Sequence, residues 1–154
     1  DRQEVSISLG ISPNIYTVLI LGGGNGLGRV QEVAEALADL PAQVLVVTGI
    51  NEKLREALSR VEKNTPNLFV YGYAENIYDL MDASDLCVTK PGGITIAECM
   101  AKGLPIMVYG KPLPGPETEN MDYLAKNSIL ELYCDTESLK DAVRKRLNDY
   151  HTKN

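Results

Sequence analysis

The first feature of this sequence that could bind a ligand is a glycine-rich turn that follows an apolar run. Residues 16–21 (YTVLIL) form a continuous β-branched and aliphatic run, which predicts a buried strand, and residues 22–28 read GGGNGLG. Glycines leave backbone amides open to an anion, and the helical spacing of apolar residues from Val30 onward places a helix N-terminus beside them. The turn can therefore hold a phosphate, although the same glycines would also serve a tight strand-to-helix connection.

The two best-known phosphate fingerprints do not fit this turn. No placement gives G-x-G-x-x-G, and the next strand ends in Thr48-Gly49-Ile50-Asn51, without the acidic residue that holds an NAD ribose. Gly23 and Gly28 have the spacing of a P-loop, but Arg29-Val30 follows where Lys-Ser/Thr would be needed. A dinucleotide-binding domain and an ATPase are both disfavoured.

A second strand, glycine turn and helix follow at residues 89–98 (TKPGGITIAE). Thr95 falls in the first turn of the predicted helix, where amides already favour an anion, and Glu98 lies one turn further along. At this i, i+3 spacing both side chains project from one side of the helix, so Thr95 can contact a phosphate while Glu98 accepts two ribose hydroxyls. The spacing fits a nucleotide, and the alternative is a helix cap and a solvated glutamate.

Alternating strands and helices must position these two turns. The sequence predicts strands at 16–21, 43–48, 68–71, 86–89, 105–109 and 129–133, with helices at 30–38, 52–63, 77–83, 94–102, 117–127 and from 138 onward. Such alternation predicts an α/β fold, a Rossmann-like doubly wound and mostly parallel sheet whose ligands lie beyond the carboxyl ends of the strands. We expect one domain over residues 16–154, with residues 1–15 as a connecting segment.

Composition narrows the class of protein. The 154 residues are 44% apolar, which suits one globular domain, and no apolar run reaches the roughly 20 residues that span a bilayer. A net charge of −6 argues against binding a nucleic-acid backbone. The three cysteines have neither a C-x-x-C spacing nor an even number, so neither a zinc site nor a disulfide framework is expected, and a reducing cytoplasmic setting fits best.

Residues 89–120 (TKPGGITIAECMAKGLPIMVYGKPLPGPETEN) resemble the donor-binding signature of GT-B glycosyltransferases, above all monogalactosyldiacylglycerol synthases and processive diacylglycerol glucosyltransferases. That family shares a GGG-x-G-x-G loop, a TK-x-GG-x-T-x-x-E segment and a PGQE-x-x-N segment. The resemblance covers the chain from Thr17 onward and implies the C-terminal, donor-binding half of a GT-B fold. It implies that the N-terminal half, which carries the acceptor site and the catalytic base, is absent here.

Carried onto this sequence, the resemblance implies a complete set of contacts to a UDP-sugar. The uracil would lie against Tyr73 and Ala74, the ribose against Glu98, and the hexose against Glu117, with Asn120 supporting that loop. The diphosphate would lie between two groups of residues, Gly23, Gly24 and Asn25 on one side and Gly92, Gly93 and Thr95 on the other. Pro116 departs from the family's glutamine and removes both a side-chain amide and a backbone N–H.

The resemblance also implies the reaction. A UDP-hexose would transfer galactose or glucose to diacylglycerol with inversion, without a metal or cofactor, at a cytoplasmic membrane surface where the full-length enzyme is peripheral. A chain without the N-terminal half would supply no catalytic residue and would be inactive alone. Two alternatives stay open at this point: a stand-alone donor-binding subunit that needs a separate acceptor-binding chain, and half of a nucleotide-sugar epimerase.

Overall fold

The computed structural model describes residues 1–21, 30–72, 77–90, 93–109, 116–127 and 129–153. At its centre is a six-stranded sheet in the order β3-β2-β1-β4-β5-β6. All five pairings between neighbouring strands are parallel, as the alternating pattern predicted. The strands are β1 (Thr17–Leu21), β2 (Gln43–Val47), β3 (Leu68–Tyr71), β4 (Leu86–Thr89), β5 (Ile106–Tyr109) and β6 (Leu130–Tyr133).

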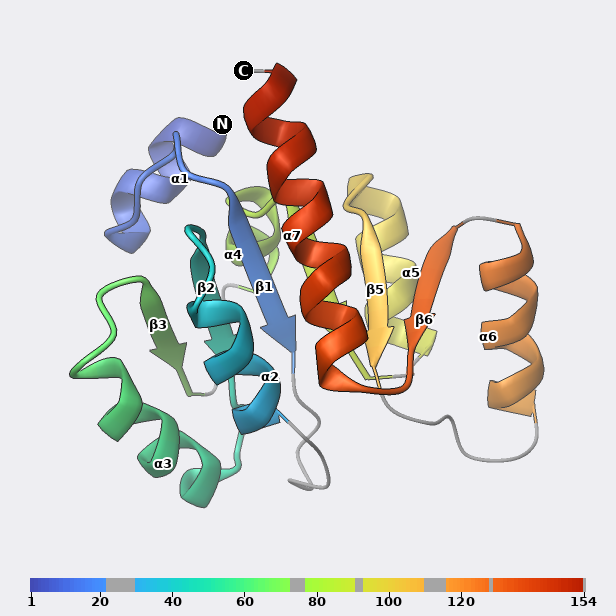
Figure 1. Ribbon diagram of the computed structural model, residues 1–154, viewed down its shortest axis with the longest axis horizontal. Helices are drawn as coiled ribbons and strands as arrows, with labels where there is room; N and C mark the ends of the chain where they lie inside the picture. The colour runs from blue at the N-terminus through green and yellow to red at the C-terminus, as the bar shows by residue number, and fades with distance from the viewer. Residues whose placement is uncertain (22–29, 73–76, 91–92, 110–115, 128, 154) are drawn as a thin grey trace.

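Helices cover both faces of this sheet, which makes the fold a doubly wound α/β sandwich (Figure 1). One face is covered by α2 (Val30–Ala38), α3 (Glu52–Glu62) and α7 (Thr136–Lys153). The other is covered by α1 (Arg2–Leu9), α4 (Ile77–Asp82), α5 (Gly93–Lys102) and α6 (Pro116–Lys126). The predicted Rossmann-like fold is confirmed.

The four central strands, β2, β1, β4 and β5, read as nearly continuous apolar runs because both of their faces are buried. In β1, Val18 and Ile20 pack beneath α2 and α7, whereas Leu19 packs on the opposite face, and all three are fully buried. Successive side chains point to opposite faces of a strand, so one run of residues contributes to both cores.

A helix that the sequence patterns did not indicate lies within residues 1–15. The Asp1 side chain accepts a hydrogen bond from the Gln3 N–H at 2.8 Å and caps α1, and Gly10 ends the helix in the left-handed conformation at φ 78°. Arg2 then forms a two-bond ion pair with Asp85, at 2.5 and 2.8 Å, and Asp85 also accepts from the Thr17 N–H at 2.8 Å. Helix α1 is therefore fastened to the starts of β1 and β4.

Candidate functional site

The carboxyl ends of all six strands meet at one edge of the sheet, the lower edge in Figure 1. The strand order reverses between β1 and β4, because β2 continues from β1 on one side and β5 follows β4 on the other. In open α/β sheets a ligand binds at such a point. The two glycine turns follow β1 and β4 directly in the sequence, and the carboxyl ends of these two adjacent strands lie at the expected position.

Six of the predicted site residues lie outside the described part of the chain: Gly23, Gly24, Asn25, Tyr73, Ala74 and Gly92. Their roles stay predictions. The structure describes the strand ends and helix starts on either side of them, and these carry the geometry of the site.

Helix α5 begins at Gly93, directly after the second glycine turn, and carries Thr95 and Glu98. Ile96 and Cys99 point into the core and are 2% and 0% exposed, which fixes the rotation of the helix. Thr95 and Glu98 each precede one of these anchors, and both are half-buried rather than fully solvated. The predicted i, i+3 pair therefore shares one flank of a helix that starts beside the switch point.

Lys90 is a residue of this edge that the sequence reasoning missed. It follows Thr89, the last residue of β4, and the Thr89 hydroxyl donates to the Lys90 carbonyl oxygen at 3.1 Å. Partial burial lowers the pKa of Lys90 from its ordinary value, and Lys90 forms no ion pair with any described residue. The signal was a lysine that ends an apolar strand just before a Gly-Gly turn, a position that suits an anion.

Replacing Lys90 by methionine should weaken the binding of a diphosphate ligand about fivefold, as expected for losing one partly solvated charge-assisted contact. Wild-type affinity should also fall as the pH rises through the lowered pKa of Lys90, because only the ammonium attracts the anion. Titration of both proteins with UDP from pH 7 to pH 10 checks this, and the wild-type curve should be the steeper one. Parallel curves would contradict it.

The ends of β2 and β3 are held together by a short hydrogen-bonded frame. The Thr48 N–H donates to the Tyr71 carbonyl at 2.9 Å, and the Gly49 N–H donates to the Gly72 carbonyl at 3.2 Å. Gly49 adopts φ 64°, and a Cβ atom at Gly72 would lie 3.1 Å from Nη1 of Arg55. The positive φ favours glycine at position 49, whereas a side chain at position 72 would only need the flexible, exposed Arg55 side chain to move by a few tenths of an ångström.

Glu117 and Asn120 lie near the start of α6, the helix that follows β5. The structure describes the backbone of these two residues but not their side chains. The helix itself is anchored, because Met121 and Leu124 are only 0% and 8% exposed in the core beneath it. The structure thus puts both residues on an anchored helix that leaves the carboxyl edge.

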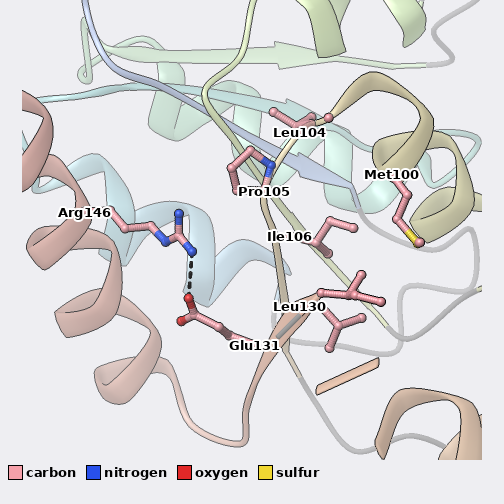
Figure 2. A pocket seen from close by; sticks show the side chains of 9 residues that line it. Met100, Leu104, Pro105, Ile106, Leu130, Glu131 and Arg146 are labelled. Atoms are coloured by element: carbon pink, nitrogen blue, oxygen red, sulfur yellow. Dashed lines mark hydrogen bonds and ion pairs between the residues drawn. The ribbon is translucent and has the colours of Figure 1, made fainter. Parts of the chain in front are cut away.

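Two cavities formed by described residues lie away from this edge. The one in Figure 2, about 440 Å³, opens between the end of α5, the starts of β5 and β6, and α7. Arg146 and Glu131 form an ion pair of 2.7 Å at one side, and Met100, Leu104 and Ile106 form an apolar wall. The other, about 680 Å³, lies by the starts of β2 and β3 near Pro41, Pro66 and Phe69. Neither coincides with the predicted nucleotide site.

Comparison with known proteins agrees with the Rossmann-like fold described above and identifies the family. Residues 17–154 match the model of the glycosyltransferase family 28 C-terminal domain. Processive diacylglycerol beta-glucosyltransferases of Bacillus subtilis (strain 168) and Bacillus pumilus (strain SAFR-032) are 39% and 38% identical over 145 and 151 residues. These alignments cover 92% and 96% of this chain but only 38% and 39% of the relatives, so the chain spans about two-fifths of their length.

Solved structures show the same fold. WaaG, a glycosyltransferase involved in lipopolysaccharide biosynthesis, superposes with a TM-score of 0.69 at 23% identity, covering 96% of this chain and 42% of that one. MurG of Acinetobacter baumannii superposes with a TM-score of 0.70 at 20% identity, covering 87% and 41%. The sheet, the helices and the matched family model agree, and the chain belongs to the glycosyltransferase family 28 C-terminal domain family, with the architecture of the corresponding half of GT-B glycosyltransferases.

Proposed function

We propose that this chain is the donor-binding domain of an inverting glycosyltransferase that moves a hexose, glucose or galactose, from UDP to diacylglycerol. The observation that carries the proposal is the 39% identity, over 92% of the chain, to a relative named processive diacylglycerol beta-glucosyltransferase. That relative's name supports a glucosyl donor and a diacylglycerol acceptor. The acceptor and the catalytic base belong to a further domain in this proposal, so the chain alone binds the donor without turnover.

The proposed contacts follow the carboxyl edge of the sheet. Glu98 accepts hydrogen bonds from the ribose hydroxyls, and Thr95 contacts the diphosphate from the first turn of α5. The uracil lies against Tyr73 and Ala74. The diphosphate also contacts five residues of the two glycine turns, Gly23, Gly24, Asn25, Gly92 and Gly93. The hexose contacts Glu117, and Asn120 supports that loop. The half-buried flank that Thr95 and Glu98 share supports the first two assignments.

The proposed catalytic contribution of this half is electrostatic. When the bond between the hexose and UDP breaks, negative charge grows on the departing phosphate. Helix N-termini at the two glycine turns and the ammonium group of Lys90 would stabilise that charge without a metal or cofactor. Because these groups are already in place, little reorganisation accompanies the reaction.

Contact with a membrane is part of the proposal only for the full-length enzyme. No helix in the described ranges has both the length and the apolar character needed to cross a bilayer. On α7, Lys140, Arg144 and Arg146 each pair with a carboxylate, on Asp39, Asp141 and Glu131, at 2.7 to 3.2 Å. These pairs reduce the positive charge that α7 offers to anionic lipid, whereas Lys145 on the same helix is exposed and forms no ion pair with a described residue.

Calorimetric titration of the chain with UDP, UDP-glucose and UDP-galactose tests the proposal. We expect heat from all three and a lower Kd for one of the two sugars than for UDP. ADP serves as the control because it shares the diphosphate and ribose and differs in its base. Absence of heat with all three uridine ligands would contradict the proposed function, whereas equal binding of ADP would contradict only the uracil contact.

A further inference from the structure

The hydroxyl of Tyr109 is a buried polar group without a partner. Tyr109 is the last residue of β5, its side chain is 5% exposed, and the hydroxyl makes no hydrogen bond with any described residue. A buried hydroxyl that lacks a hydrogen bond destabilises a folded protein, so such groups are uncommon and usually have a separate use. Phenylalanine would fill the same volume without this cost.

The position of Tyr109 connects it to the candidate site. Thr89 of β4 is the register partner of Val108, and continuing that parallel register by one residue places Lys90 opposite Tyr109. Leu86 and Val88 of β4 pack in the core beneath α2 and α7, as Tyr109 does, so alternation assigns Lys90 to the same side of the sheet. The backbones of Lys90 and Tyr109, whose side chains form no ion pair or hydrogen bond with a described residue, thus lie on adjacent strand ends beside the switch point.

The chemistry of the pair selects an anionic ligand. Burial raises the pKa of Tyr109 far above its ordinary value, so the hydroxyl keeps its proton at physiological pH and acts as a donor. The ammonium group of Lys90 is likewise a donor and carries a positive charge. A phosphate oxygen accepts hydrogen bonds and balances that charge, whereas a sugar hydroxyl or an apolar group would leave the cation uncompensated.

We propose that Tyr109 is a donor-binding residue whose hydroxyl donates a hydrogen bond to a phosphate oxygen of the bound nucleoside diphosphate. This rests on the proposed function and adds a contact from β5, a strand that the sequence analysis did not associate with the diphosphate. The ligand-free protein bears the cost of the unpaired hydroxyl, and the ligand removes that cost when it binds.

The substitution Tyr109→Phe tests the proposal because it removes one oxygen atom and preserves the packing. UDP affinity should fall about tenfold, the size expected for a hydrogen bond to a charged acceptor, while the affinity for uridine, which has no phosphate, stays within twofold. The Tm of the ligand-free variant should equal or exceed that of the wild type, by up to about 4 °C. Lower affinity together with undiminished stability is a combination that a purely structural hydroxyl would not produce.

Tyr16→Phe is the matched control, since Tyr16 is also 5% exposed but precedes β1 at the opposite edge of the sheet. Its UDP affinity should match that of the wild type. The proposal is overturned if Tyr109→Phe binds UDP within twofold of the wild type, or if it loses UDP and uridine binding equally. A wild-type chain that bound no UDP would overturn the proposed function and this inference together, whereas normal wild-type binding with an unaffected variant would overturn this inference alone.

Discussion

Replacing Glu98 by alanine should weaken the affinity for UDP by roughly 1 to 3 kcal/mol, or about 5- to 150-fold, and leave the fold intact. The loss follows because a half-buried carboxylate that accepts two ribose hydroxyls is replaced by a methyl group that accepts none. The fold should persist because the core anchors of α5 are Ile96 and Cys99, which the substitution does not touch. Calorimetry at constant salt measures the affinity, and thermal unfolding measures the stability.

Two further variants make this result specific. Glu98→Gln keeps one acceptor oxygen and should lose less affinity than Glu98→Ala. Glu56→Ala removes an exposed glutamate from α3 and should bind UDP as the wild type does. If Glu98→Ala retained wild-type affinity for UDP, the ribose assignment would be wrong even if the chain bound nucleotides by other contacts.

The second large effect concerns stability. Substituting Asp85 by alanine should lower the free energy of unfolding by about 2 to 4 kcal/mol, because three hydrogen bonds from Arg2 and Thr17 lose their acceptor in a mostly buried position. The Asp85 side chain is only 14% exposed, so water replaces the lost carboxylate poorly. For a chain of this length we expect Tm to fall by roughly 5 to 15 °C.

Asp82→Ala is the matched control for this variant. Asp82 also forms an ion pair, with Lys102 at 2.8 Å, but the two side chains are 39% and 33% exposed, so the pair should contribute less than about 1 kcal/mol. The double variant Arg2→Ala, Asp85→Ala should be less destabilised than the sum of the single variants. If Asp85→Ala melted no earlier than Asp82→Ala, residues 1–15 would not be an energetic part of the folded domain.

The sheet was predictable because its central strands are buried on both faces. The run LCVT in β4 is buried at all four residues, LFVY in β3 is apolar or aromatic throughout, and the predicted bounds of both strands match the structure. The sequence predicted a doubly wound, mostly parallel sheet but not the order of its strands, which the structure supplies. Short loops and parallel pairing leave few alternatives for an alternating chain of this length.

The first residues of helices were less predictable because neighbouring polar residues can each serve as the N-terminal cap. The start of α7 was placed at Ser138, a residue type that often caps helices, but the helix begins at Thr136. The Asp135 carboxylate accepts from the Ser138 N–H at 2.8 Å, and the Ser138 hydroxyl donates to Asp135 at 3.0 Å, so the aspartate fills the role expected of the serine. Helix α1 was missed since RQEVSISL has little helical periodicity and is stabilised by tertiary contacts such as that of Arg2.

For the candidate site, the sequence indicated the relative placement of residues on a helix better than that of residues at strand ends. The shared helix flank of Thr95 and Glu98 was predictable because an i, i+3 relation after a glycine turn fixes where both side chains project, and their binding roles stay predictions. Nothing in the sequence indicated that Lys90 and Tyr109 are neighbours, because their relation depends on the register between β4 and β5, which no local pattern encodes. The hexose contacts of Glu117 and Asn120 stay predictions. Pro116, beside them, replaces the family's glutamine, so sugar preference is the property that the resemblance predicts least well.

The ion pair between Glu131 and Arg146 affects whether another strand could pair with the edge strand β6. β6 is one of the two outermost strands, and Glu131 at its second position receives hydrogen bonds from Arg146 and from the Tyr133 hydroxyl. A foreign strand that tried to extend the sheet past β6 would have to dehydrate this charged group, which is energetically unfavourable. The pair of Glu131 and Arg146 therefore acts against strand addition at this border of the sheet.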